Sequence, residues 1–447
     1  MTDVSKLQGV WRTNGHNKIF VITSDDFKIF DISKISCVLA YTDTLETFEQ
    51  LFDRFELESH NQFSMYTRWG ITKYTLVKQK SLLDVYGQLN KADEVNPEYN
   101  FEVFWQYFAE NYAFFEQRGV DWEEVYRTYR LMVTQKTTNA KLVDVISKAI
   151  HTLNDPQITL EVDGQQAITM KSHPLGSHWQ REFNSTAFPD LYPKGIPSLY
   201  KAVHSHILLG LSKSALNHQM IWGKIRPYIG YLNVFALMDM FADVDLHRHG
   251  GFEAVNNEYL IAVRNVMSVI MDDFRDMKAV ILDLRFTSGG HEAASVIIAN
   301  HFADQDRLAY IKKAVSGNDF TEPQEVYIRP EGEFQFSGPI ALLTSEVTAN
   351  AAEIFIHCMM ARPHVVRVGN KTSGMVSHML QKQLPNGWKI RLPNEVYQTA
   401  NGNVYQGIGI LPDLEEPVFY NRDFHNFYPG LRFTVEEAIS HLRAKLF

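Results

Sequence analysis

Cysteine is scarce in this sequence: Cys37 and Cys358 are the only two among 447 residues. Two thiols so far apart in the chain provide neither a disulfide framework nor a cysteine-rich metal site. We expect each to be a small buried hydrophobe rather than a reactive group. No metal and no cofactor is therefore expected.

Long apolar runs and an excess of positive charge are also missing. No stretch of about 18 uncharged apolar residues occurs, so no membrane-spanning helix is expected. The amino terminus, MTDVSKLQGVWRTNGHNK, lacks the basic-then-apolar order of a secretory signal, which predicts a cytoplasmic protein. Lysine and arginine total 43 against 52 acidic residues, and the formal net charge is -9. Neither nucleic acid nor a membrane surface is expected as a partner.

Hydrophobic residues make up 45% of the sequence, and the chain is long enough for two or three globular domains with cores of their own. Residues 1–92 alternate short apolar and β-branched runs with turn residues, which predicts a small antiparallel β domain. Residues 93–163 change to a helical period and predict a helical subdomain. Residues 164–221 are rich in His, Ser and Pro and are interpreted as a connector.

An α/β core is predicted over residues 222–430, followed by a C-terminal helix over 431–447. Fully apolar short strands such as KAVILDLR, GPIALLTS and VVRVG alternate there with helical segments, a pattern typical of a sheet covered on both faces. Asn386-Gly387 and Asn401-Gly402 then interrupt alternating runs, as hairpin turns do.

Two strand-turn-helix segments could carry chemistry. In KAVILDLRFTSGGHEAAS, the N–H groups of Gly289 and Gly290 could converge on an anion or a developing oxyanion, although a tight turn alone would also need glycine. In GPIALLTSEVTANAAEIF, residues 348–352 stand where a strained elbow would present a nucleophile. Asn350 would also serve as an ordinary helix N-cap, which explains it without any chemistry.

A family resemblance rests on motifs found in order over about residues 100 to 418. They are DWEEVYRTYR, TLNDPQITL, YIGYLNVFAL, DLRFTSGG, LLTSEVTANAAEIF, VGNKTSGM, LPNGWKIRLP and YQGIGILPD. This series resembles the tail-specific, C-terminal-processing serine peptidases, most closely the tricorn-like and retinoid-binding branch without a PDZ insert. The resemblance implies a crotonase-like α/β core with a helical subdomain beside it, and a peptide or protein C terminus as partner.

Carried over position by position, the resemblance finds the catalytic side chains replaced. The nucleophile position is Asn350, the base position is Gln157, and the position of the acid that orients the base is Gln406. Where another branch places a lysine base, this chain has Met375. The positions implied for oxyanion or substrate binding are retained: Gly289, Gly290 and Ala351.

An amide cannot be activated as an acyl-transfer nucleophile near neutral pH, and glutamine has no titrating group for general-base catalysis. The leading hypothesis is therefore a degenerate peptidase that keeps the family cleft and binds a peptide or protein C terminus there, beside an exposed strand. Whether the chain forms a homo-oligomer is left open by the sequence.

Three alternatives compete with this hypothesis. The first is an active serine peptidase whose catalytic residues have moved, with Ser345 or Ser373 as nucleophile and His151 or His357 as base. The second is a carrier of a small apolar ligand such as a retinoid or fatty acid, suggested by the retinoid-binding relatives and by 29 Phe and 20 Tyr, although aromatic residues more often form cores. The third is a metal site, but its residues are more often a solvated loop. Those residues are Asp243, Asp245, His247 and His249.

Overall fold

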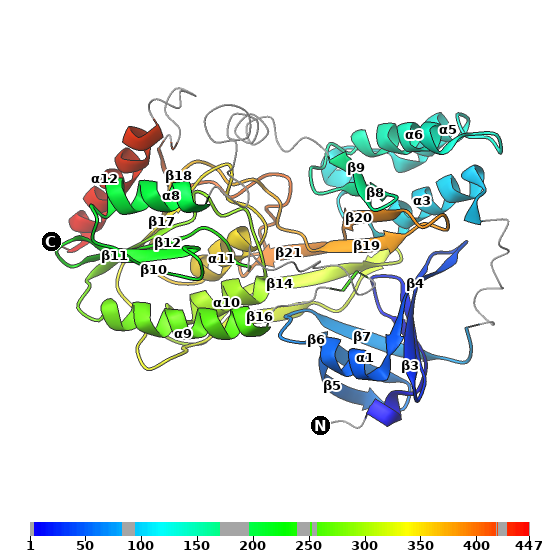
Figure 1. Ribbon diagram of the computed structural model, residues 1–447, viewed down its shortest axis with the longest axis horizontal. Coiled ribbons are helices and arrows are strands. Elements are labelled where there is room, and N and C mark those ends of the chain that lie inside the picture. The colour runs from blue at the N-terminus through cyan, green and yellow to red at the C-terminus, as the bar shows by residue number, and fades with distance from the viewer. Residues whose placement is uncertain are drawn as a thin grey trace.

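The computed structural model describes residues 4–82, 94–169, 196–238, 251–252, 257–416, 418 and 427–446. Figure 1 shows an α/β unit on one side, a group of helices and an N-terminal β unit on the other, and long strands between them. The fold is thus mixed α/β, and the described residues form four sheets.

The central sheet has seven strands in the order β10-β11-β12-β13-β17-β18-β22. Neighbours are parallel from β12 to β22, whereas β10 and β11 pair antiparallel. The strands span Lys213–Ala215, Met220–Arg226, Ile229–Val234, Ala279–Asp283, Ile340–Thr344, Val365–Gly369 and Leu414–Glu415. Every residue of β12, β13 and β17 is buried, which explains their continuous apolar sequences.

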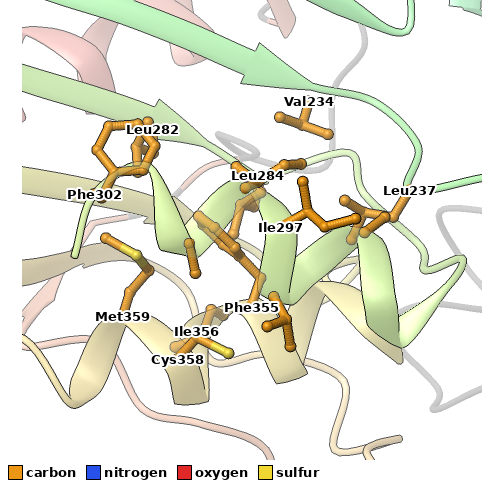
Figure 2. Packing of buried hydrophobic residues seen from close by; sticks show 14 of the residues in the cluster. Val234, Leu237, Leu282, Leu284, Ile297, Phe302, Phe355, Ile356, Cys358 and Met359 are labelled. Atoms are coloured by element: carbon orange, nitrogen blue, oxygen red, sulfur yellow. The ribbon is translucent and has the colours of Figure 1, made fainter. Parts of the chain in front are cut away.

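Helices cover both faces of this sheet (Figure 1). One face packs against α9 (Asn257–Asp273), α10 (Glu292–Asn300) and α11 (Ala351–Met360). The other packs against α8 (Ile196–Ala202), the π-helical turn η2 (Val203–Ile207) and α12 (Phe427–Leu446). Figure 2 shows from close by the core between the sheet and helices α10 and α11. Leu284, after β13, lies there near Ile297 of α10 and Phe355 of α11.

Two further sheets link the α/β unit to the rest of the chain. In one, β14 lies between β16 and β21 and also pairs with the short β15; these strands span Arg307–Ser316, Gln324–Ile328, Glu395–Thr399 and Asp319–Phe320. The other has the order β19-β20-β8-β9, with strands Met379–Gln383, Lys389–Pro393, Thr159–Val162 and Gln165–Thr169.

The helices of residues 97–151 pack on β8 and β20 around a core rich in aromatic side chains. They are α3 (Pro97–Asn111), α4 (Phe115–Arg118), α5 (Trp122–Arg130) and α6 (Asn139–His151). Trp122 and Phe108 from two of these helices have ring centroids 5.2 Å apart. The aromatic residues of this region thus form a core between helices and sheet.

The N-terminal unit is a seven-stranded antiparallel sheet in the order β4-β3-β2-β1-β7-β6-β5. In chain order its strands are Gly9–Thr13, Lys18–Ile22, Asp26–Ile32, Cys37–Thr44, Phe52–Ser59, Gln62–Thr67 and Lys73–Gln79. The short 3-10 helix η1 (Val4–Leu7) precedes them, and α1 (Leu45–Leu51) connects β4 to β5. Phe252, which follows far along the chain, completes the core of this unit.

Pairing across the chain differs from the predicted divisions in two places. The central sheet begins at Lys213, inside the segment predicted as a connector, because β10 and β11 extend the sheet antiparallel from β12. Strand β8, which follows the helices, is hydrogen-bonded to β20 near residue 390, and β9 pairs with the other edge of β8. Sequence periodicity finds strands but does not reveal partners so distant in the chain.

Other predictions concern what the chain lacks. Cys358 is buried in the α/β core and Cys37 is half-buried on β4. No helix in the described ranges is long and apolar enough to cross a membrane. The described residues contain no group of three or more side chains arranged to hold a metal ion, and the acidic and histidine string at residues 243–249 lies outside them.

Candidate active site

Asn350 occupies a sharp turn between the end of β17 and the start of α11. Its backbone has φ 52° and ψ -124°, a strained conformation for a residue other than glycine. Asn350 stands at the N-cap position of α11, as predicted, but its side chain makes no cap hydrogen bond. Instead, Asn350 Nδ2 donates to the carbonyl oxygen of Ser288 at 3.0 Å, so the amide points away from the helix. This is the geometry of an elbow that presents one side chain.

Gln157 and Gln406 join Asn350 in a continuous chain of side-chain amides. Gln157 Nε2 donates to Asn350 Oδ1 at 3.2 Å, and Gln406 Nε2 donates to Gln157 Oε1 at 2.6 Å. Gln157 Nε2 also lies 3.0 Å from the carbonyl oxygen of Ser377, while Gln406 Oε1 accepts from the backbone N–H groups of Val376 and Ser377. Three positions far apart in the sequence thus meet in the predicted order.

Gly289 and Gly290 lie directly beside this turn. Their φ angles of 133° and 139° are accessible to glycine and strained for other residues. A Cβ atom on Gly289 would lie 2.7 Å from Asn350 Cβ, so the two segments approach as closely as backbone allows. Among the hydrogen bonds of the described residues, neither glycine N–H has a protein acceptor. Both donors therefore remain available at the turn that carries Asn350.

A buried carboxylate fixes the opposite side of the turn. Glu353, in the first turn of α11, accepts from Thr372 Oγ1 at 2.5 Å and from the N–H groups of Gly374 and Met375 at 2.8 and 2.7 Å. Burial raises the pKa of Glu353 to about 7. The backbone N–H of Asn350 in turn donates to the carbonyl oxygen of Met375, so this segment is fixed against Asn350.

A pocket of about 280 Å³ opens next to Asn350. Its lining residues are Met238, Ser288, Gly289, Gly290, Glu292, Asn350, Ala351, Ile354, Val376, Ser377, His378, Met379 and Tyr397. The predicted site residues thus divide into two groups. Asn350, Ala351 and the two glycines line the pocket, whereas Gln157 and Gln406 are buried behind it.

The pocket also contains residues that sequence reasoning missed, namely Glu292, His378 and Tyr397. Glu292 follows the glycine pair by two residues, which is the one local signal that could have drawn attention to it. His378 immediately precedes β19 and Tyr397 lies on β21, and no sequence pattern marks them.

The residues considered for a relocated catalytic pair do not meet. Ser345 Oγ donates to the carbonyl oxygen of Arg285 at 2.6 Å, and the N–H of Ser373 donates to Thr348. His151 contacts the carbonyl oxygen of Ser147 on its own helix. Both ring nitrogens of the buried His357 lack a partner in the described part of the chain, and burial lowers its pKa to about 4. No serine–histidine pair forms among these four residues.

Two family models match parts of the chain. Residues 251–416 match the model of Peptidase family S41, and residues 93–151 match the model of the Tricorn protease C1 domain. A carboxyl-terminal-processing protease of a Picosynechococcus species is 27% identical over 143 residues, 31% of this chain and 33% of that protein. The carboxy-terminal processing protease CtpA of Bacillus subtilis is 25% identical over 138 residues, 31% of this chain and 28% of that protein.

These matches span about a third of each curated relative. A candidate peptidase from Parabacteroides merdae of known crystal structure shares the fold, with a TM-score of 0.59 and 24% identity over 78% of this chain and 96% of that one. The two family models cover both the helices that carry Gln157 to the site and the core that carries Asn350. By these matches, the chain is similar to the tail-specific, C-terminal-processing peptidases, with family models matching over residues 93–151 and 251–416.

Proposed function

We propose that this chain holds a peptide or protein C terminus in the pocket beside Asn350 without cleaving it. The observation that carries the proposal is the hydrogen-bonded amide chain Asn350–Gln157–Gln406. The family resemblance assigns these three residues to the positions of nucleophile, base and orienting acid. An amide side chain cannot be activated as an acyl-transfer nucleophile, and none of the three side chains titrates near neutral pH.

Ligand binding is supported by what the site retains. The unpartnered N–H groups of Gly289 and Gly290 are suited to a carboxylate or a carbonyl oxygen. Residues 376–379 line the pocket and lead into β19, which pairs with β20 along one edge only. An extended peptide could therefore add to the beginning of that strand. Relatives named for carboxyl-terminal processing make a C terminus the natural ligand to test.

The proposal takes the central α/β unit as a crotonase-like core, in keeping with the family resemblance. Parallel strands β12, β13, β17 and β18 covered by helices on both faces support this assignment. In such a core, the turn after a strand is where backbone donors and a presented side chain meet, as they do at Gly290 and Asn350.

Peptidase assays test the absence of chemistry. We expect the wild type to show no turnover of unstructured peptides with free carboxyl termini, and no labelling by a serine-directed phosphonate. The triple variant Asn350→Ser, Gln157→His, Gln406→Glu should gain slow turnover, because loss of such a triad removes a factor of about 10⁶ in a well-studied serine peptidase. Wild-type cleavage that Asn350→Ala abolishes would sink the proposal.

Binding is measured separately, by fluorescence anisotropy of a labelled peptide with a free or an amidated C terminus. We expect the free acid to bind more tightly, since the two glycine N–H groups favour an anion. Ser373→Ala, in a turn outside the pocket lining, provides a control that should leave both affinities unchanged.

A further inference from the structure

Glu292 places a carboxylate on the wall of the pocket beside Asn350. It is the first residue of α10, and its side chain is 9% exposed. Tyr310 Oη donates to Glu292 Oε1 at 2.5 Å, and Lys312 Nζ donates to Oε2 at 2.8 Å. Tyr397 Oη lies 3.2 Å from the same Oε2. The carboxylate is thus held in one orientation by strands β14 and β21.

The positive charge that faces Glu292 is shared with a second carboxylate. Lys312 Nζ lies 3.4 Å from Glu395 Oε2 and also donates to Thr72 Oγ1 at 2.6 Å. Lys312 and Glu395 are each 2% exposed. His16 Nε2 approaches Glu395 Oε1 at 3.1 Å, but burial lowers the pKa of His16, so it is neutral near pH 7. Two carboxylates therefore share one lysine, leaving one buried negative charge without a full partner.

The remainder of the pocket is suited to a long apolar stem. Ile354 and Val376 are buried on its walls, and Met238 and Met379 add unbranched, adaptable side chains. The volume of about 280 Å³ accommodates a side chain of several methylene groups. A long cation satisfies both features, because it buries its methylene stem and carries its charge at the end.

We propose that the pocket selects a peptide whose side chain at this position is long and ends in a cation, lysine or arginine, and that Glu292 determines this specificity. The inference rests on the proposed function, because it names the class of C terminus that the cleft holds. The N–H groups of Gly289 and Gly290 would take the peptide's carboxylate while its last side chain enters the pocket.

Three labelled peptides test the inference by anisotropy with the wild type. They share one sequence and a free carboxyl terminus and end in lysine, norleucine or glutamate. Norleucine has the same methylene chain as lysine without the ammonium group. We expect lysine to bind about 10-fold more tightly than norleucine and glutamate to bind most weakly.

The variant Glu292→Gln should reduce the lysine preference to about twofold or less while changing norleucine affinity little. The matched control Glu325→Gln, an exposed carboxylate on β16, should keep the full preference. Equal wild-type affinities for lysine and norleucine would overturn the inference and leave peptide binding intact. Failure of all three peptides to bind would overturn the proposed function itself. Because the wild-type comparison needs no variant, it decides the matter even if Glu292→Gln does not fold.

Discussion

Gly290 illustrates how a single residue sets the geometry of the site. Its φ is 139°, and a Cβ atom there would lie 2.3 Å from the carbonyl carbon of Leu237. The reason is that Leu237 and Gly290 form a β-bridge, with the N–H of His291 donating to Leu237. A side chain cannot be added without moving one of the two backbones, and with it the donors beside Asn350.

We therefore predict that Gly290→Ala lowers the free energy of unfolding by about 2–4 kcal/mol, the combined effect of a disfavoured φ and a backbone clash. Gly317→Ala is the matched control: its φ of 67° is also positive, but no neighbouring atom lies within 4 Å. That change should cost about 1 kcal/mol. Urea titration of both variants measures the difference, and equal losses would contradict the role of the clash.

At the scale of elements, Glu353 joins α11 to the segment around Met375. Because burial raises its pKa to about 7 from the usual 4.5, the folded state disfavours the charged form. The stabilising contribution of the neutral carboxyl is complete below about pH 4.5 and is lost as pH rises through 7.

We predict that the wild type loses more unfolding free energy between pH 4.5 and 8 than Glu353→Gln does, by about 3 kcal/mol. The variant cannot titrate at this position, and the remaining titrating groups are common to both proteins. Chemical denaturation at several pH values measures the two curves. Parallel curves would show that Glu353 keeps an ordinary pKa in the folded protein.

Elements specified by local sequence could be predicted well. The predicted strand-turn-helix segment GPIALLTSEVTANAAEIF contains β17 and the start of α11, because an apolar strand, a polar turn and an apolar helix follow one another there. Asn386-Gly387 does connect the antiparallel strands β19 and β20. Asn401-Gly402 forms a turn but no hairpin, since the preceding β21 pairs with β14 instead.

The candidate site was predictable where ordered motifs mark it and not where distant strands build it. The resemblance placed Asn350, Gln157 and Gln406 together, and their hydrogen bonds agree. Glu292 and Tyr397 meet only because β14 and β21 pair across more than 80 residues of sequence. No pattern within either segment indicates that partner.

At the scale of the whole molecule, the N-terminal sheet lies beside β19 (Figure 1), and buried charges attach the two. Lys18 Nζ lies 2.6 Å from Asp31 Oδ1 and donates to the carbonyl oxygen of Gln381 at 3.1 Å. The N–H of Gln383 donates to Asp31 Oδ2 at 2.8 Å. Lys382 Nζ is 3.6 Å from the same aspartate, and burial lowers its pKa to about 7. These side chains cover the edge of β19 beyond Met379. A peptide strand could therefore pair only with the beginning of β19.

Asp31 is the acceptor common to all of these donors, so its removal takes away the carboxylate that balances the buried lysine charge. We predict that Asp31→Ala lowers the free energy of unfolding by about 3–5 kcal/mol, whereas Asp144→Ala, which breaks two exposed ion pairs on α6, has a much smaller effect. Urea titration compares the variants. Similar losses for the two variants would contradict this prediction. They would mean that the N-terminal sheet is held against β19 mainly by apolar contacts such as those of Phe252.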